Sequence, residues 1–142
     1  MRQRLLRLII WLVVLICPAI SIEAKSSSYF SIQFIDVGQG DSALVECDGH
    51  YMLIDGGDQS AGDIVYNVLV EKGIQRLDIL AVSHLHADHI GGLIKVLTYA
   101  SAIDKTICNT DTGETEIFRE FEHQLSINGS KITVPQVGEN IN

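Results

Sequence analysis

The stretch Ser83-His84-Leu85-His86-Ala87-Asp88-His89-Ile90-Gly91-Gly92 places three of the chain's five histidines and an aspartate within six consecutive positions. Imidazole and carboxylate groups are ligands that zinc and other first-row divalent metals accept in proteins. Alternate side chains of an extended segment point the same way, so His84 and His86 can face one ion. Asp88 and His89 would then face a second ion. The stretch therefore predicts a site for two divalent metal ions, zinc or manganese.

The residues on either side of this stretch place it within a fold. Leu77–Val82 is a short apolar run typical of a buried strand, and 90–99 has apolar residues at helical spacing. The histidines would thus lie where a strand ends and a helix begins. Binding sites of α/β sheets form at this end of the strands, where a helix N-terminus adds partial positive charge.

Two further motifs precede the histidines. Leu53-Ile54-Asp55-Gly56-Gly57 followed by His84-x-His86-x-Asp88-His89 resembles the metallo-β-lactamase superfamily. Phe34-Ile35-Asp36-Val37-Gly38-Gln39-Gly40-Asp41-Ser42 resembles its ComEC-type competence-protein branch in particular, and argues against a β-lactam-specific enzyme. The resemblance implies an αββα sandwich, two metal ions and metal-dependent hydrolysis. In this branch it implies a small-molecule, phosphodiester or DNA substrate.

The resemblance also implies roles for single residues. The first ion would use His84 and His86, and the second Asp88 and His89. Asp88 would be the catalytic residue, since its carboxylate could orient the attacking water or accept a proton from it.

Three residues from the earlier motifs would support these ligands. Asp55 would orient metal ligands through hydrogen bonds. Gln39 and Asp41 would lie in a loop beside the metal centre and meet the substrate. A simpler interpretation of that loop is a strand followed by a glycine turn.

Other features of the superfamily are missing from the sequence after Gly92. Its members carry a third histidine for the first metal, a bridging aspartate and a final histidine downstream, whereas this chain has only His123. His123 lies off the apolar stripe of the expected helix 116–125 and is expected to be a surface residue. With two protein donors per ion, weak metal binding is expected. Two hypotheses remain: a hydrolase represented by its N-terminal portion, truncated before its later ligands, or a non-catalytic remnant or binding module that needs a partner chain or a second copy.

The pattern of apolar residues predicts an α/β (α+β) fold, the N-terminal half of the αββα sandwich, over residues 30–142. Helices should cover one face of a single sheet and leave the other face open. The expected strands lie near 29–35, 43–47, 51–54, 77–82, 105–108 and 131–134, and the expected helices near 63–72, 90–99 and 116–125.

The first residues form a separate unit. Three arginines precede the unbroken apolar run Leu8–Cys17, so residues 1–24 are interpreted as a signal peptide or, failing cleavage, a membrane anchor. Residues 25–29 would be a linker. In either case the domain is expected to be exported, with membrane contact only through this segment.

Net charge bears on the expected partners, and cysteine content bears on whether a disulfide forms. The net charge is −8, which disfavours DNA as a partner in general, although a local site is still open. Cys47 and Cys108 are expected to be two buried thiols rather than a disulfide, since free cysteine behaves as a small apolar residue.

Overall fold

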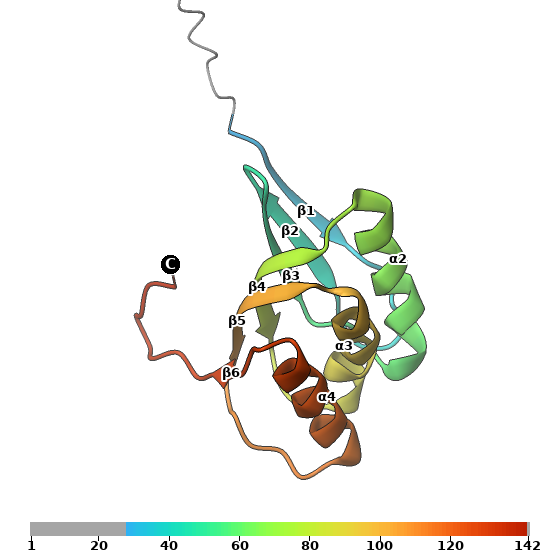
Figure 1. Ribbon diagram of the computed structural model, residues 1–142, viewed down its shortest axis with the longest axis vertical. Coiled ribbons are helices and arrows are strands. Elements are labelled where there is room, and N and C mark those ends of the chain that lie inside the picture. Colours follow the sequence, from blue (N-terminus) through green and yellow to red (C-terminus); the bar gives the residue numbers. More distant parts are fainter. Residues whose placement is uncertain (1–27, 142) are drawn as a thin grey trace, which may run out of the picture.

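The computed structural model describes residues 28–141, and these form one six-stranded sheet with helices beside it (Figure 1). The expected signal or anchor at 1–24 lies outside the described residues, as does most of the expected linker. Within 28–141, no helix is both long and apolar enough to cross a membrane. The strands are β1 (Phe30–Phe34), β2 (Ala43–Cys47), β3 (His50–Ile54), β4 (Arg76–Val82), β5 (Ala102–Cys108) and β6 (Ile132–Thr133). The helices are the 3-10 turn η1 (Gln59–Ala61), α2 (Gly62–Lys72), α3 (Ala87–Tyr99) and α4 (Glu116–Ile127).

The strands lie in the sheet in the order of the sequence, β1 to β6. The first two pairings are antiparallel and the remaining three are parallel. The β2 to β3 hairpin turns at Asp48 and Gly49, both with positive φ, as the Asp-Gly pair predicts. The parallel pairings need crossovers, and α2, α3 and α4 provide them.

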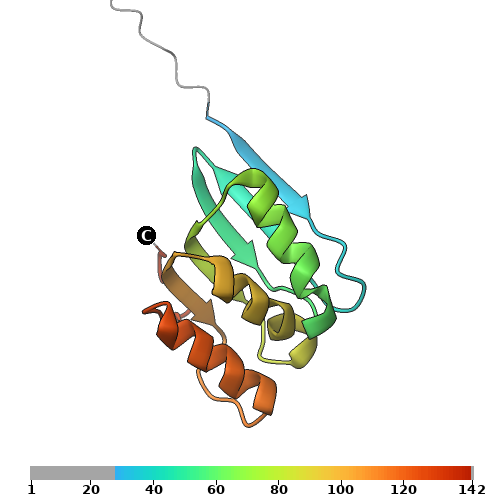
Figure 2. The ribbon, with the colours of Figure 1, turned by 45° about the vertical axis from the view of Figure 1, so that its right-hand side comes forward.

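All three α-helices lie on one face of the sheet (Figure 2). The register explains how that face is filled: Leu44, Leu53 and Leu80 are aligned across β2, β3 and β4, and all three are buried. Side chains on the helices complete the core, and Phe121 of α4 is fully buried. Alternation along the strands therefore determines which face carries the helices.

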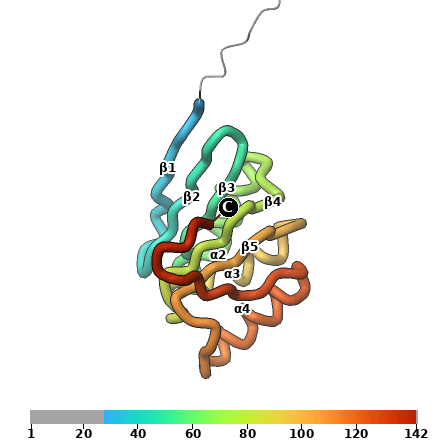
Figure 3. The backbone as a smooth tube through the Cα atoms, turned by 90° about the vertical axis from the view of Figure 1, so that its left-hand side faces the viewer, coloured from blue at the N-terminus to red at the C-terminus, as the bar shows by residue number. Residues whose placement is uncertain are grey.

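Among residues 28–141, no helix lies on the opposite face of the sheet. Ile32, Val45, Met52 and Ile79 form an aligned row on this face, across β1 to β4. On the edge strand β1, the side chain of Phe34 is 83% exposed. After β6 the chain runs along this side of the sheet, where residues 134–137 lie near Ile54 and Ala81 (Figure 3). The expected α/β half-sandwich with one covered face is confirmed.

The structure differs from the expectation in some element boundaries and in the burial of one cysteine. The helix expected from residue 90 begins at Ala87, because the backbone oxygen of His86 already accepts from the amides of His89 and Ile90, at 3.0 and 3.1 Å. Strand β6 has only two residues. Cys108 is buried as expected, but Cys47 is exposed because it lies at the hairpin end of β2 on the open face.

An ion pair at the edge of the sheet yields a pH prediction. The Asp78 carboxylate accepts from Nδ1 of His50 at 2.8 Å and raises the pKa of His50. His50 in turn lowers the pKa of Asp78. The stabilisation from protonated His50 is complete below the pKa of about 6.5 that histidine has in the unfolded chain, and it is lost as pH rises through the raised pKa of the folded state. The stabilisation from ionised Asp78 is present above the unfolded pKa of about 3.9, and it is lost as pH falls through the lowered pKa of the folded state.

We therefore expect His50→Gln to lower the melting temperature chiefly between about pH 4 and 6.5, with an effect that fades as pH rises through the raised pKa of His50. Thermal unfolding across this range measures the difference from the wild type. His123→Gln, an exposed histidine on α4, is the matched control and should show no such window. An equal deficit for His50→Gln at every pH would contradict the assignment.

Candidate metal centre

The predicted site residues lie at one edge of the sheet, where three strands end. β1, β3 and β4 all run in the same direction, so their carboxyl ends meet at this edge. β1 leads into the loop 35–42, β3 into Asp55, and β4 into Ser83 and the histidines that follow it. The site is thus built from segments that are far apart in sequence, at the place expected for an α/β sheet.

Backbone hydrogen bonds connect these segments. The amide of Gly57 donates to the oxygen of Asp41 at 3.0 Å, and the amide of Gly92 donates to the oxygen of Gly57 at 3.1 Å. The amide of Gly56 also donates to the oxygen of His89 at 2.8 Å. The loop after β3 is therefore held between the loop after β1 and the first turns of α3. This arrangement fixes the relative positions of the three motifs.

Three imidazole rings gather beside this junction. The ring centroid of His84 lies 4.5 Å from that of His86 and 3.9 Å from that of His89. His84 and His86 belong to the segment between β4 and α3, with Leu85 buried between them as the alternation predicts. Asp88 and His89 instead lie in the first turn of α3, which begins three residues before the expected helix. The helix brings His89 back against His84.

A buried carboxylate lies behind two of these rings. Asp55 is 1% exposed, and its oxygens accept from the Ser83 amide at 2.8 Å, the Ser83 hydroxyl at 2.5 Å and Nδ1 of His89 at 2.9 Å. Its φ of 52° lies in the left-handed region, which aspartate tolerates better than most residues. The Asp55 carboxylate therefore faces His89 as an orienting group would.

The expected substrate loop also contacts the ligand stretch. The amide of Gln39 lies 3.4 Å from Oδ2 of Asp88 as a donor. This contact, with the helix backbone and the nearby His89 and His86, lowers the pKa of Asp88. Asp88 is thereby favoured as an anion, the form that binds a cation.

One carboxylate lies closer to the centre than the sequence indicates. Possible ligand atoms of Asp41, Asp55 and His89 all lie within 4.8 Å of one another. Asp41 was expected to meet substrate, and its distance from the others also suits a metal ligand. No spacing signal reveals this, because Asp41 reaches the centre through the Gly57 contact rather than through a local pattern.

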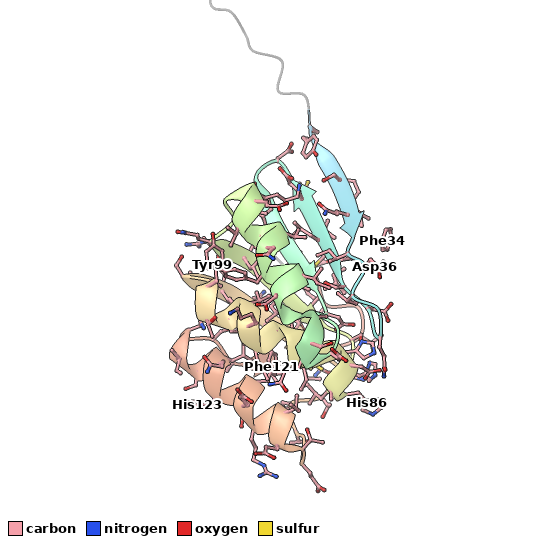
Figure 4. All side chains as sticks on the ribbon, turned by 90° about the vertical axis from the view of Figure 1, so that its right-hand side faces the viewer. Phe34, Asp36, His86, Tyr99, Phe121 and His123 are labelled. Atoms are coloured by element: carbon pink, nitrogen blue, oxygen red, sulfur yellow. The ribbon has the colours of Figure 1, made fainter. Side chains whose placement is uncertain are left out.

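His123 does not join the site. It is exposed on α4, as expected, whereas His86 lies near the other end of the helix layer (Figure 4). The structure brings together His84, His86, Asp88, His89, Asp55, Gln39 and Asp41.

This donor set fits a divalent metal. The rings of His84, His86 and His89 lie close together, and possible ligand atoms of Asp41 and Asp55 lie within 4.8 Å of His89. Nitrogen and oxygen donors of this kind suit a first-row divalent metal. The hydrogen bond from Nδ1 of His89 to Asp55 leaves Nε2 as the ligating atom, which is the usual arrangement of a metal-binding histidine.

The sequence model of the metallo-β-lactamase superfamily matches residues 35–104, a region that contains the whole site and, apart from Phe34, all three motifs. Residues 35–104 belong to the metallo-β-lactamase superfamily. Within this superfamily, 85 residues of the chain are 35% identical to the competence protein ComA of Neisseria gonorrhoeae, over 58% of this chain and 12% of that protein. The predicted relationship to the competence-protein branch of the metallo-β-lactamase superfamily is confirmed.

Solved metallo-β-lactamase structures show the same fold. The β-lactamase SMB-1, solved with 2-mercaptoethanesulfonate, superposes with a TM-score of 0.57 at 18% identity, over 80% of this chain and 47% of that one. A Thermotoga maritima protein assigned to the metallo-β-lactamases gives a TM-score of 0.52 at 13% identity, over 80% of this chain and 62% of that one. The chain spans 12% of the competence protein and less than two thirds of each solved structure.

Proposed function

We propose that this protein is an exported metal-dependent hydrolase whose metallo-β-lactamase domain acts on phosphodiester bonds. The observation that carries the proposal is the cluster of three imidazoles, in which the rings of His89 and His86 lie 3.9 and 4.5 Å from that of His84. A possible ligand atom of Asp41 lies within 4.8 Å of one of His89. The phosphodiester class rests on the resemblance of residues 34–42 to the ComEC-type branch, and the similarity to a competence protein supports that relationship. The net charge of −8 favours a small phosphodiester over bulk binding of DNA.

The residues divide into ligands and supporting groups. His84 and His86 would hold one zinc or manganese ion, and Asp88 and His89 a second. When bound, the metals lower the pKa of water and stabilise negative charge at the reacting centre. Asp88 would orient the attacking water or accept a proton from it. Its lowered pKa keeps the carboxylate ionised and its contact with Gln39 holds it in place, which favours the orienting role.

The supporting groups have separate tasks. Asp55 would keep His89 in position through the hydrogen bond to Nδ1. Gln39 and Asp41 would line the approach of the substrate, with Asp41 close enough to add a ligand. Export is supported by the basic residues followed by an apolar run at the N-terminus.

The open sheet face favours a second candidate function, a binding module. Phe30, Ile32 and Phe34 of the edge strand are all exposed, and the aligned row Ile32, Val45, Met52 and Ile79 extends this apolar face across four strands. A separate chain or a second copy that supplies the other layer of the sandwich would bury it. In that case the metal ligands need not support turnover.

Metal content tests the proposal. With two protein donors per ion the metal is bound weakly, so we expect the purified chain, in equilibrium dialysis against zinc or manganese, to hold about two equivalents by elemental analysis. The double variant His84→Ala/His86→Ala should lose at least one of them. The double variant His50→Ala/His123→Ala removes two histidines outside the cluster and should retain the wild-type amount. Hydrolysis of a chromogenic phosphodiester by the loaded wild type, lost in the first variant, would support the substrate class.

Two results would contradict the proposal. Retention of no metal by the wild type would favour the binding module. Equal retention by both double variants would mean that the metal lies elsewhere.

A further inference from the structure

The hydroxyl of Ser83 contacts three site residues that differ in what they can donate. Its Oγ lies 2.5 Å from Oδ2 of Asp55, 3.0 Å from Nδ1 of His84 and 3.3 Å from Nδ1 of His89. A serine hydroxyl has one proton to donate and can accept through its lone pairs. The position of that proton therefore determines which ring nitrogens carry protons.

The carboxylate of Asp55 determines where the hydroxyl proton of Ser83 lies. An ionised carboxylate can only accept, and the contact with Ser83 is the shortest of the three, so the hydroxyl proton points to Asp55. Toward His84, the Ser83 oxygen can then only accept. Nδ1 of His84 must be the donor, which leaves its Nε2 without a proton and able to bind a metal.

His89 also carries its proton on Nδ1, because it contacts Asp55 directly. Its Nδ1 lies 2.9 Å from the Asp55 carboxylate, which again can only accept. Asp55 thus holds His89 directly, and reaches His84 only through the Ser83 hydroxyl.

We propose that Ser83 is a positioning residue that links Asp55 to His84 as a relay: its hydroxyl donates to the Asp55 carboxylate and accepts from Nδ1 of His84. This contact fixes the Nδ1–H tautomer of His84, so that two predicted metal ligands, His84 and His89, both present Nε2. The importance of this tautomer for metal binding rests on the proposed function, but the tautomer itself does not. Without a partner at Nδ1, neutral histidine prefers the Nε2–H form, so removal of the hydroxyl should affect the two histidines differently.

The test compares Ser83→Ala with Ser83→Thr, which keeps the hydroxyl, in the metal-free full-length chain. Long-range ¹H–¹⁵N spectra of histidine-labelled protein at a pH near 8.5 report the tautomer of each neutral ring. We expect Nδ1–H at both His84 and His89 in the wild type and in Ser83→Thr. In Ser83→Ala, His84 should shift toward Nε2–H while His89 keeps Nδ1–H. Zinc titration should then show a loss of about 10- to 100-fold in affinity for Ser83→Ala and near wild-type binding for Ser83→Thr.

The outcomes distinguish the role proposed for Ser83 from the proposed function. An Nε2–H form of His84 in the wild type, or an unchanged His84 in Ser83→Ala, would overturn the relay. A change at both histidines in Ser83→Ala would also overturn it, since that would indicate a general structural role. The expected tautomers together with no zinc binding by the wild type would support the relay and contradict the proposed function instead.

Discussion

Gly40→Ala is expected to destabilise the protein by about 3 kcal/mol or more and to abolish metal retention. Two costs combine at this position. Gly40 has a φ of +89°, where an alanine is strained by about 1–2 kcal/mol. A methyl group there would also overlap the backbone oxygen of Asp88, which is fixed in the first turn of α3. The loop or the helix must move, and either shift displaces predicted ligands.

The matched control lies two residues earlier in the same loop. Gly38 has a φ of +75°, but a methyl group there would have no atom within 4 Å. Gly38→Ala should therefore show only the backbone cost of about 1–2 kcal/mol and retain metal. Urea unfolding and elemental analysis of both variants measure the difference. Similar free energies of unfolding for the two would show that the loop is not held against α3.

The second large effect concerns the buried carboxylate. Asp55→Asn keeps the shape and the left-handed backbone, but replaces one acceptor oxygen by an NH₂ donor. Asp55 accepts from two donors of Ser83 and from His89, so one of these donors loses its buried partner. We expect a loss of about 2–4 kcal/mol in stability and of about 10- to 100-fold in zinc affinity.

Asp48→Asn is the control for this substitution. Asp48 has a similar φ of 49°, but it lies exposed in the β2 to β3 turn. An asparagine oxygen can still accept from the Tyr29 amide there, so stability should change by less than about 0.5 kcal/mol. If Asp55→Asn were as mild as Asp48→Asn in unfolding and in zinc titration, Asp55 would have no orienting role.

Much of the sheet was predictable because its signals are local. The short, mainly apolar runs at 43–47 and 77–82 and the Asp-Gly turn between β2 and β3 predict their strands at or within one residue of the observed bounds. The helix stop at Gly73 is equally local, with a φ of 69° and hydrogen bonds back to the last turn of α2. The start of α3 was placed three residues late, because the ligand stretch contains few apolar residues and its helical turn shows no periodicity.

The candidate site was predictable in membership but not in arrangement. His84, His86, Asp88 and His89 are consecutive enough to be recognised as a cluster. The contact of Asp55 with Ser83 and the approach of Asp41 depend on pairing between segments 28 and 14 residues apart, and nothing in either segment alone encodes that distance. Ser83 was not singled out at all, since a serine before a histidine has no distinctive signal.

The strictly sequential strand order also bears on how the chain acquires its structure. Each strand pairs with the strand that precedes it in sequence, so no strand must wait for a later one to be inserted. The two antiparallel pairings close shorter loops than the three parallel pairings, which enclose a helix each. We expect the sheet to grow from β1 toward β6, so that the Asp55, Ser83 and His89 junction is assembled once α3 docks, before β5 and β6 have paired.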